Sequence, residues 1–464
     1  MTVLAGPVPV ADPGAAGTSP LPEEFGRTSR PASVGGLGAV GTHLLAGPAP
    51  GRGEHLGGHA ARWGPLPGLD GTQIRALLRS SGLDGRGGGF PLIRKVESAR
   101  LAVGDPLVVV NASESEPASR KDRTLCSDRP HLVLDGAALL ARAVGVEEVV
   151  VHFHRGAISS IRAMEAALTD RLRGSIADPR WRISAGPDRY VSGESSAVAS
   201  FVGGGEARPH FTTVPLAVRG PSGGPTVVSN VETVAHLAAI ARTGSDAWAA
   251  RGAVTSPGPR LVTVTGMVGV PGQVLELTGV CTVGDILRAA GIATAPGAVL
   301  LGGFAGTWVR GDTAWPVPFT RDGLRHVGAQ PGCGLVGVLP GDACVLAETA
   351  RIIGYLAGES AGQCGTCVAG LPRLAAGWEA LASGGLSRRG LRRLRQLADT
   401  VDGSGACGHP DAVVRLARSA LDVFGDDVGD HLAGRPCGGA GRAPTLPVPA
   451  THRAAGHDDP GAWR

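Results

Sequence analysis

Strand-like and helix-like segments alternate between residue 106 and about residue 250, and this alternation restricts the fold more than any other feature of the sequence. The run PLVVVNA (106–112) is short and β-branched, as a buried strand is, and VEEVVVHF (146–153) repeats that pattern. Apolar residues at helical spacing mark DGAALLARAVGV (135–146) and ISSIRAMEAALTDRL (158–172). We therefore expect an α/β domain built on a mostly parallel sheet.

The pattern changes twice beyond this first domain, which we place at 41–255. Residues 256–312 contain short strands, one helix and Gly/Pro-rich turns, which is typical of a small α+β module. Within 330–437 the pattern is helical from about residue 345, which predicts a small helical domain. The ends, 1–40 and 438–464, are rich in Pro, Gly and Ala without sustained periodicity, so we expect a disordered arm and a disordered tail.

Charge and composition exclude several classes of function. The 44 Lys and Arg residues nearly balance the 40 Asp and Glu residues, and aromatic residues make up only 4% of the 464 positions. We therefore expect no nucleic-acid partner. No run approaches the roughly 18 apolar residues of a membrane-spanning helix, and the N-terminus lacks the basic segment of a signal peptide. We expect a soluble, cytoplasmic protein without membrane insertion.

The rarest polar residues mark the segments that we expect to carry function. The chain has two residues each of lysine, asparagine and tyrosine, namely Lys95, Lys121, Asn111, Asn230, Tyr190 and Tyr355. Positive charge otherwise comes from arginine, so a retained lysine indicates a position that favours a compact ammonium group. Five of these six residues fall within four short segments or no more than four residues beyond them. Drift in a composition-biased chain is the alternative explanation for any one of them.

A glycine-rich loop follows the helical segment TQIRALLRS (72–80). The loop reads GLDGRGGGFP (82–91), and clustered glycines let backbone N–H groups approach a phosphate closely, with Arg86 or Lys95 supplying positive charge. It is not a Rossmann fingerprint, because Phe90 takes the third glycine position, and it lacks the GK[ST] of a P-loop. In a chain with 74 glycines, a plain flexible turn is the alternative.

Three further segments place polar residues beside predicted strands or helices. The loop NASESEP (111–117) follows a buried strand, where α/β sheets bind ligands, so Asn111, Glu114 and Glu116 are candidates for contacting a cofactor. YVSGESS (190–196) and PTVVSNVET (225–233) each precede a helix. Taken singly, the first segment is also explained as a solvated charged loop, and the other two as helix caps at Ser195 and Asn230.

Cysteine spacing indicates metal chemistry in the helical domain. Cys364 and Cys367 form a C-x-x-C motif on a Gly-rich turn, and Cys407 and His409 follow downstream. The pattern fits a [4Fe–4S] cluster, a zinc site of three cysteines and His409, or a redox dithiol, and the dithiol is disfavoured because no thioredoxin-like strand precedes it. The remaining cysteines are scattered, and we expect them to be small buried hydrophobic side chains: Cys126, Cys281, Cys333, Cys344 and Cys437.

Taken in order, these segments resemble one family: the NADH-binding flavoprotein (F) subunit of respiratory complex I, with its relatives in formate dehydrogenases and hydrogenases. The family motifs are GRGGAGFP…K, NADEGEPGxxKDR, YxxGEETA, PTxVNNVET and SCGxCxPCR. The corresponding segments here are GRGGGFP…K, NASESEPASRKDR, YVSGESSA, PTVVSNVET and SAGQCGTCV. The resemblance covers about residues 70–435, and five motifs in order are far more specific than any one of them.

The resemblance implies an FMN-binding α/β domain (41–255), a ubiquitin-like β-grasp module of the SLBB type (256–312) and a helical iron–sulfur domain (330–437). It implies that NADH reduces FMN and that electrons then pass through a [4Fe–4S] cluster to a ferredoxin-like, quinone-linked or other iron–sulfur partner protein. By position, Glu116 and Tyr190 become catalytic residues beside the nicotinamide. Cluster ligands become Cys364, Cys367 and Cys407. Cofactor-binding positions become Gly85, Arg86, Gly87, Gly88, Gly89, Lys95, Asn111, Glu114, Gly193, Glu194, Ser229 and Asn230.

The glycine loop is one residue shorter than in the family, and four of the substituted positions bear directly on the predicted site. Ser113, Ser195 and Ser229 stand where the family has Asp, Glu and Asn, and Ala361 replaces the first cluster cysteine. A fourth cluster ligand then has to come from elsewhere, for example His409, Cys344 or a partner protein. Two hypotheses follow. One is an electron-transfer protein that uses NAD(P)H, FMN and a cluster; the other is a paralogue that keeps the fold for partner binding, with its cysteine site empty or holding zinc.

Overall fold

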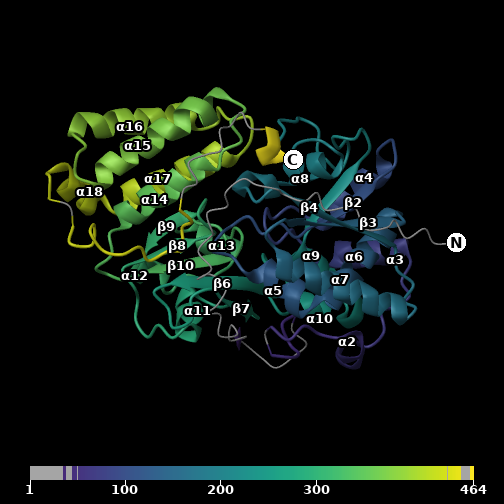
Figure 1. The fold of residues 1–464 in the computed structure, drawn as a ribbon. Coiled ribbons are helices and arrows are strands. Elements are labelled where there is room, and N and C mark those ends of the chain that lie inside the picture. The colour runs from purple at the N-terminus through teal and green to yellow at the C-terminus, as the bar shows by residue number, and fades with distance from the viewer. Residues whose placement is uncertain (1–34, 38–43, 50, 436, 451–459) are drawn as a thin grey trace, which may run out of the picture.

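The computed structural model describes residues 35–37, 44–49, 51–435, 437–450 and 460–464. Figure 1 shows an α/β domain beside a second sheet, with the helices of the C-terminal third packed on that second sheet. Most of the arm predicted at 1–40 lies outside the described residues. Within the described residues, no helix is both long and apolar enough to cross a lipid bilayer.

Four strands, all parallel, form the central sheet of the first domain in the order β4-β3-β2-β5. They are β2 (Leu107–Asn111), β3 (Glu148–His154), β4 (Arg180–Gly186) and β5 (Thr226–Asn230). The helices of this domain are α2 (Leu56–Trp63), α3 (Gly71–Ser81), α4 (Leu92–Leu101), α5 (Lys121–Asp128), α6 (Pro130–Val144), α7 (Ile158–Arg173), α8 (Ser195–Val202), α9 (Val231–Thr243) and α10 (Ser245–Ala249). The prediction of an α/β domain with a parallel sheet is confirmed.

Helices bury both faces of this sheet, which explains why its strands are continuous apolar runs. Val108 and Val110 of β2 pack in the same core as α6 and α9, whereas Val109 points to the opposite face and packs with α8. Helices α6 and α9 lie in very close contact, because a Cβ at Gly136 would stand only 1.7 Å from the Val234 carbonyl oxygen. Glycine at this position therefore allows α6 and α9 to approach each other this closely.

The order of the strands creates a crevice at one edge of the sheet. The chain runs outward from β2 through β3 to β4 and then returns to the other side of β2 as β5. The carboxyl ends of β2 and β5 therefore lie side by side, with Asn111 paired to Asn230. Open α/β sheets bind ligands at such a reversal of strand order.

The second sheet has the order β1-β7-β6-β10-β8-β9. Its strands are β1 (Gly35–Leu37), β6 (Arg260–Gly266), β7 (Gln273–Leu277), β8 (Ala298–Leu301), β9 (Thr307–Arg310) and β10 (Leu335–Leu339), with helices α11 (Val283–Ala289), α12 (Gly311–Ala314) and α13 (Arg321–Arg325). Two features differ from our predictions. Strand β1 falls within the expected arm, and β10 lies at the centre of the sheet although we ended the module at 312. The sequence does not show that β10 belongs to this sheet, because its parallel partner β6 lies about 70 residues earlier.

The C-terminal third is helical, as predicted. It contains α14 (Val345–Gly358), the π-helical turn η2 (Thr366–Gly370), α15 (Leu371–Ala382), α16 (Arg388–Val401), α17 (His409–Val423) and α18 (Gly425–Leu432). The described parts of the expected tail are not free of the fold. Leu446 is 2% exposed, and Trp463 is fully buried between the Arg189 and Arg208 guanidinium groups, 4.7 and 4.8 Å from its ring. The composition of this segment did not predict these contacts, because each of them depends on one apolar side chain.

Candidate functional site

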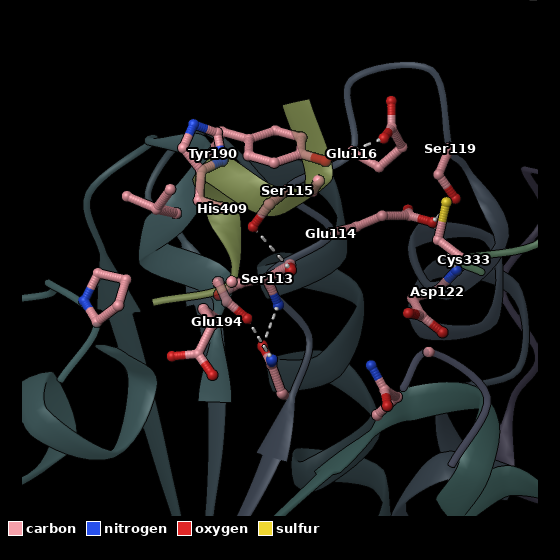
Figure 2. A pocket seen from close by; sticks show the side chains of 18 of the residues that line it. Ser113, Glu114, Ser115, Glu116, Ser119, Asp122, Tyr190, Glu194, Cys333 and His409 are labelled. Carbon is pink, nitrogen blue, oxygen red and sulfur yellow. Dashed lines mark hydrogen bonds between the residues drawn. The ribbon is translucent and has the colours of Figure 1, made fainter. Parts of the chain in front are cut away.

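A cavity of about 400 Å³ opens at the carboxyl ends of β2 and β5. This volume is within the range of about 300–1,000 Å³ that small-molecule sites occupy. Figure 2 shows side chains from the first domain and from the start of α17 converging on it. The predicted site residues that line it are Arg86, Gly87, Asn111, Glu114, Glu116, Tyr190, Gly193, Glu194, Asn230 and Cys407. The structure thus brings together segments that are far apart in the sequence.

The glycine loop forms a tight turn beside this cavity. The Gly89 N–H donates to the Gly85 carbonyl at 2.8 Å, and the Gly85 N–H donates to the Phe90 carbonyl at 2.9 Å. A Cβ at Gly87 would lie 3.2 Å from Nδ2 of Asn230, so the loop backbone lies directly against that amide. On its other side, the loop borders a second cavity of about 420 Å³, lined by Gly85, Gly87, Gly88 and Gly89 and by Arg260, Arg321 and Arg325.

Arg86 anchors the glycine loop. Its guanidinium donates to Asp84 Oδ1 and to the Pro257 carbonyl, both at 2.8 Å, and lies 5.5 Å from the centroid of the Trp248 ring. Burial lowers the pKa of Arg86 to about 10, so the side chain stays charged near neutral pH, and Asp84 balances the charge. We therefore assign Arg86 to holding the loop in place, in contrast to the phosphate contact that the resemblance implies.

The two asparagines at the crevice differ in what they are free to bind. The Asn111 amide donates from Nδ2 to the Gly193 carbonyl at 2.9 Å, and its Oδ1 accepts the Ser113 N–H at 3.1 Å. Asn230 stands at the N-cap position of α9 but makes no capping hydrogen bond with its side chain. Asn111 therefore fixes the wall of the cavity, whereas the Asn230 amide is available to a ligand.

Glu114 and Glu194 line the cavity while stabilising helix N-termini. Glu114 accepts the Asp122 and Arg123 backbone N–H groups at 3.1 and 3.0 Å, at the start of α5. Glu194 is the N-cap of α8 and accepts the Ser196 N–H at 2.8 Å. Carboxylates are favourable at helix N-termini. The helix cap that we considered at Ser195 is therefore provided by its neighbour, Glu194.

Glu116 and Tyr190 form the most unusual pair in the cavity. Oε2 of Glu116 accepts the Phe304 N–H at 2.8 Å and the Tyr190 hydroxyl at 3.4 Å, whereas its Oε1 is buried without a hydrogen-bond partner. Burial raises the pKa of Glu116 to about 7. A buried carboxyl group with an unpaired oxygen and a pKa near neutrality is a candidate for proton chemistry.

Two predicted cofactor residues lie behind the cavity wall. The Lys95 ammonium donates to the Val228 carbonyl at 2.9 Å, and burial lowers the pKa of Lys95. Ser229 pairs with Val110 inside the sheet. Neither residue is among those that line the cavity. Because strand neighbours point to opposite faces, Ser229 points away from the side on which Asn230 lies.

The sequence flagged Lys121 as rare but gave no role for it. Its Nζ lies 2.9 Å from both Asp122 and Glu232, in a buried network that joins α5 to α9. Burial alone would lower the pKa of Lys121, but these two carboxylates raise it above its ordinary value. Cys333 and His409 also line the cavity, and no sequence signal placed them there, because they come from segments that only the fold brings close.

The three predicted cluster cysteines lie at the edge of the helical domain. Cys364 and Cys367 stand at the π-helical turn η2, and Cys407 borders the cavity. Burial opposes ionisation of Cys364, yet N–H groups of Ala406 and Cys367 lower its pKa. Among the described residues, these three sulfur atoms are not part of a group compact enough for a single ion, with all ligand atoms within 4.8 Å.

Among the described residues, the chain offers no further thiol of the predicted set near these three cysteines, and the imidazole of His409 is engaged elsewhere through Nε2. Ala361, at the position of the family's first cysteine, is 2% exposed and packs with Val191 and Trp463. His409 donates from Nε2 to the Leu356 carbonyl at 2.8 Å. Cys344 precedes α14 whereas Cys364 follows it, and a helix of 14 residues is about 21 Å long. This chain therefore offers three thiol ligands from the predicted set.

Comparison with known proteins agrees with this architecture. Residues 78–239 match the family model for the Nuo51 FMN-binding domain, and residues 347–431 match the model for the NADH-ubiquinone oxidoreductase-F iron-sulfur binding region. The second of the NADH-quinone oxidoreductase F subunits of Rhizobium meliloti is 30% identical over 400 residues, which cover 83% of this chain and 94% of the relative. The NADH-quinone oxidoreductase F subunit of Streptomyces coelicolor is 29% identical, with 78% and 83% of the two chains covered.

Solved structures extend the comparison. A chain in the crystal structure of NAD+-reducing [NiFe]-hydrogenase in the H2-reduced state superposes with a TM-score of 0.71 and 28% identity. The match covers 78% of this chain and 63% of the hydrogenase chain, so our chain spans less than two thirds of that neighbour. Taken with the coverage of the curated relatives, these matches show that the chain belongs to the family of NADH-quinone oxidoreductase F subunits.

Proposed function

We propose that this chain is an electron-transfer subunit that binds FMN in the cavity at β2 and β5, receives electrons from NAD(P)H and passes them to an iron–sulfur cluster held by Cys364, Cys367 and Cys407. One observation supports the proposal above all others. A single cavity is lined by the glycine loop, the carboxyl ends of β2 and β5, the Glu116–Tyr190 pair and one of the three cysteines. A flavin bound in this cavity would lie beside a thiolate ligand.

The cavity residues fit the polar groups of a flavin. The Asn230 side chain makes no capping hydrogen bond, and Glu116 Oε1 is buried without a hydrogen-bond partner. The polar atoms of a bound heterocycle would supply the missing partners. FMN supplies the conversion between two-electron and one-electron transfer. We expect Asn111 and Gly193 to shape the wall, the Gly87 backbone to approach the cofactor, and Glu116 to hold or release a proton at Oε1 near neutral pH.

The electron acceptor is a second part of the proposal. The curated relatives are named as subunits, which implies assembly with other chains. We propose a ferredoxin-like or other iron–sulfur protein as the acceptor, docked near Cys364. We also propose a cytoplasmic location, because none of the eight cysteines forms a disulfide, as expected in a reducing compartment.

An optical spectrum of anaerobically purified protein tests the proposal. We expect flavin bands near about 370 and about 450 nm, together with a broad cluster absorbance that bleaches on reduction. Addition of NADH should bleach the flavin band. A colourless protein would instead indicate a paralogue that retains only a binding role, and a yellow protein unaffected by NADH would exclude NADH as the direct donor.

Two variants and one matched control separate the cofactors. Cys407→Ala should remove the cluster absorbance and leave the flavin bands, whereas Cys281→Ala, a buried cysteine of the second sheet, should leave both. Asn230→Leu should lower the FMN content without loss of the cluster. If Cys407→Ala keeps the cluster absorbance, Cys407 is not a ligand.

A further inference from the structure

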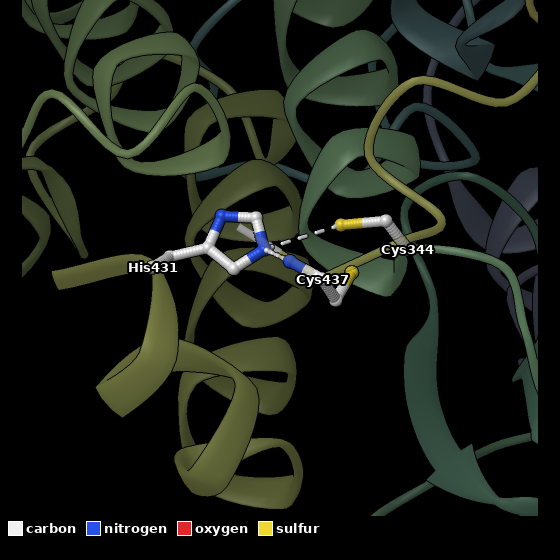
Figure 3. A group of neighbouring side chains, drawn as sticks. All are labelled: Cys344, His431 and Cys437. Atoms are coloured by element: carbon white, nitrogen blue, oxygen red, sulfur yellow. Dashed lines mark hydrogen bonds between the residues drawn. The ribbon is translucent and has the colours of Figure 1, made fainter. Parts of the chain in front are cut away.

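Three side chains that the electron-transfer site does not use meet at the base of the helical domain. Cys344 precedes α14, His431 lies near the end of α18, and Cys437 follows that helix. Their ligand atoms all lie within 4.8 Å of one another, and Figure 3 shows them converging. We expected Cys344 and Cys437 to be isolated buried cysteines, and the fold instead brings them to one histidine.

One distance is close to that expected in a tetrahedral zinc site. With Zn–S of about 2.3 Å and Zn–N of about 2.0 Å, tetrahedral geometry puts sulfur and nitrogen about 3.5 Å apart. The Cys344 sulfur lies 3.6 Å from His431 Nε2. A hydrogen bond between thiol and imidazole has a similar length, so this distance fits either a hydrogen bond or a metal site. The tautomer of His431 and the cavity beside Cys344 favour the metal site.

The tautomer of His431 is the one that a metal ligand requires. His431 is fully buried, and its Nδ1 lies 3.1 Å from the Leu381 carbonyl, which can only accept, so Nδ1 carries the proton. The Nε2 lone pair then points toward the sulfur atoms. It accepts a long hydrogen bond from the Cys437 N–H at 3.2 Å, which metal coordination would replace. Orientation of a ligating imidazole by a backbone carbonyl is the usual second contact of such sites.

Burial raises the pKa of the Cys344 thiol to about 12, so a bound divalent cation would have to displace its proton, as metal ions do at coordinating thiols. Cys344 is the N-cap of α14, and its sulfur accepts the Ala347 N–H at 3.3 Å. Helix N-termini stabilise anionic sulfur. A cavity of about 290 Å³ adjoins Cys344, so water can reach the fourth position of a tetrahedral ion. Two thiolates and a neutral imidazole around one divalent cation sum to zero charge, which a buried site tolerates.

We propose that Cys344, His431 and Cys437 bind a zinc ion with water as the fourth ligand. On binding, the two thiols release two protons to solvent and two Zn–S bonds and one Zn–N bond form. The pair of thiolates with one imidazole suits zinc among the abundant divalent cations. This site is separate from the three cysteines proposed for the cluster.

The zinc would fasten the segment after α18 to the rest of the fold. Beyond Cys437, the Thr445 N–H donates to Glu348 at 2.6 Å, and Leu446 is buried next to Gly337 of β10. The segment therefore runs from the metal ligands across α14 to the second sheet. Removing the metal should expose it to proteolysis after Gly434.

Metal analysis of the full-length protein tests this proposal. We expect about one zinc per chain after gel filtration, a loss of at least about tenfold in His431→Gln, and full retention in Cys281→Ser. Cys364→Ser should lose cluster iron but keep its zinc, so failure of the flavin–cluster proposal and failure of this one are distinguishable. Cobalt substitution of the chelated wild-type protein should give thiolate-to-cobalt charge-transfer absorbance, a measurement that does not depend on how well a variant folds.

Three outcomes would overturn the inference. The first is a zinc content below about a tenth of an equivalent in wild-type protein grown with added zinc, together with no cobalt absorbance after chelation. Cys344, His431 and Cys437 would then be joined by hydrogen bonds alone. Six titratable thiols in unreduced, denatured wild-type protein, rising to seven in Cys344→Ser, would show a disulfide between Cys344 and Cys437. Zinc that persists in folded His431→Gln would place the ion elsewhere.

Discussion

Replacing Glu116 by glutamine should make the stability of the protein less sensitive to pH. Burial raises the pKa of Glu116 from its ordinary value of 4.5 to about 7. Between these two values the folded protein holds a proton that the unfolded chain has released, so the free energy of unfolding falls as pH rises. The pKa difference corresponds to about 3 kcal/mol, lost in full above pH 7. The side chain is 7% exposed, so solvent screening changes this value little.

The Glu116→Gln variant has no carboxyl group to ionise and keeps an amide oxygen for the Phe304 N–H. Relative to wild type, its free energy of unfolding should therefore increase by most of about 3 kcal/mol between about pH 5 and about pH 8. Burial also raises the pKa of Glu276 to about 7, but that residue is present in both proteins and its contribution cancels.

Urea unfolding followed by circular dichroism at both pH values provides the measurement. Glu165→Gln, which removes an exposed carboxylate from α7, controls for the change in net charge. The reasoning is refuted if the difference in free energy of unfolding between Glu116→Gln and wild type is the same at both pH values, or is larger at the acid value. Either result would mean that Glu116 ionises at least as readily in the folded protein as in the unfolded chain.

Three further substitutions test the packing around the site. Gly193→Ala puts a Cβ 1.8 Å from Ser115 Oγ at the cavity wall, so we expect at least about tenfold weaker FMN binding in equilibrium titrations; unchanged binding would show that the wall can move. Lys121→Met leaves two buried carboxylates unpaired and should lower the free energy of unfolding by about 3–5 kcal/mol in urea titrations, with a smaller loss contradicting the buried network. Gly136→Ala drives a methyl group into the Val234 carbonyl and should lower the unfolding midpoint, by the equivalent of at least about 2 kcal/mol; a wild-type midpoint would contradict the close packing of α6 and α9.

The sequence predicted those parts of the fold that depend on local pattern. Strand β2 and helix α7 each fall within one or two residues of the predicted segments, because a buried strand and an amphipathic helix have distinct periods. The segments around Asn111, Tyr190 and Asn230 were found from their rare residues, and the cavity at β2 and β5 unites them. Local signals therefore located both the first domain and most of the cavity.

Features that depend on contacts distant in sequence could not be predicted in the same way. Arg86 reads as a phosphate ligand in the glycine loop, but its partner Pro257 lies 171 residues away. Cys344 and His431 are 87 residues apart, and neither position has a neighbouring ligand that forms a recognisable motif. Trp463 gives no periodic signal at all, although it is fully buried. In each case the deciding partner is supplied by tertiary packing.

The position of β10 has a consequence for how the chain folds during synthesis. This strand lies between β6 and β8, yet it leaves the ribosome more than 30 residues after β8. Until then, both β6 and β8 expose unpaired backbone edges, which are prone to join other chains. The second sheet can therefore close only after residue 339 has emerged, and such distant pairing slows folding. Fragments that end between β9 and β10 should consequently aggregate, whereas fragments that end before β6 leave the parallel sheet of the first domain complete.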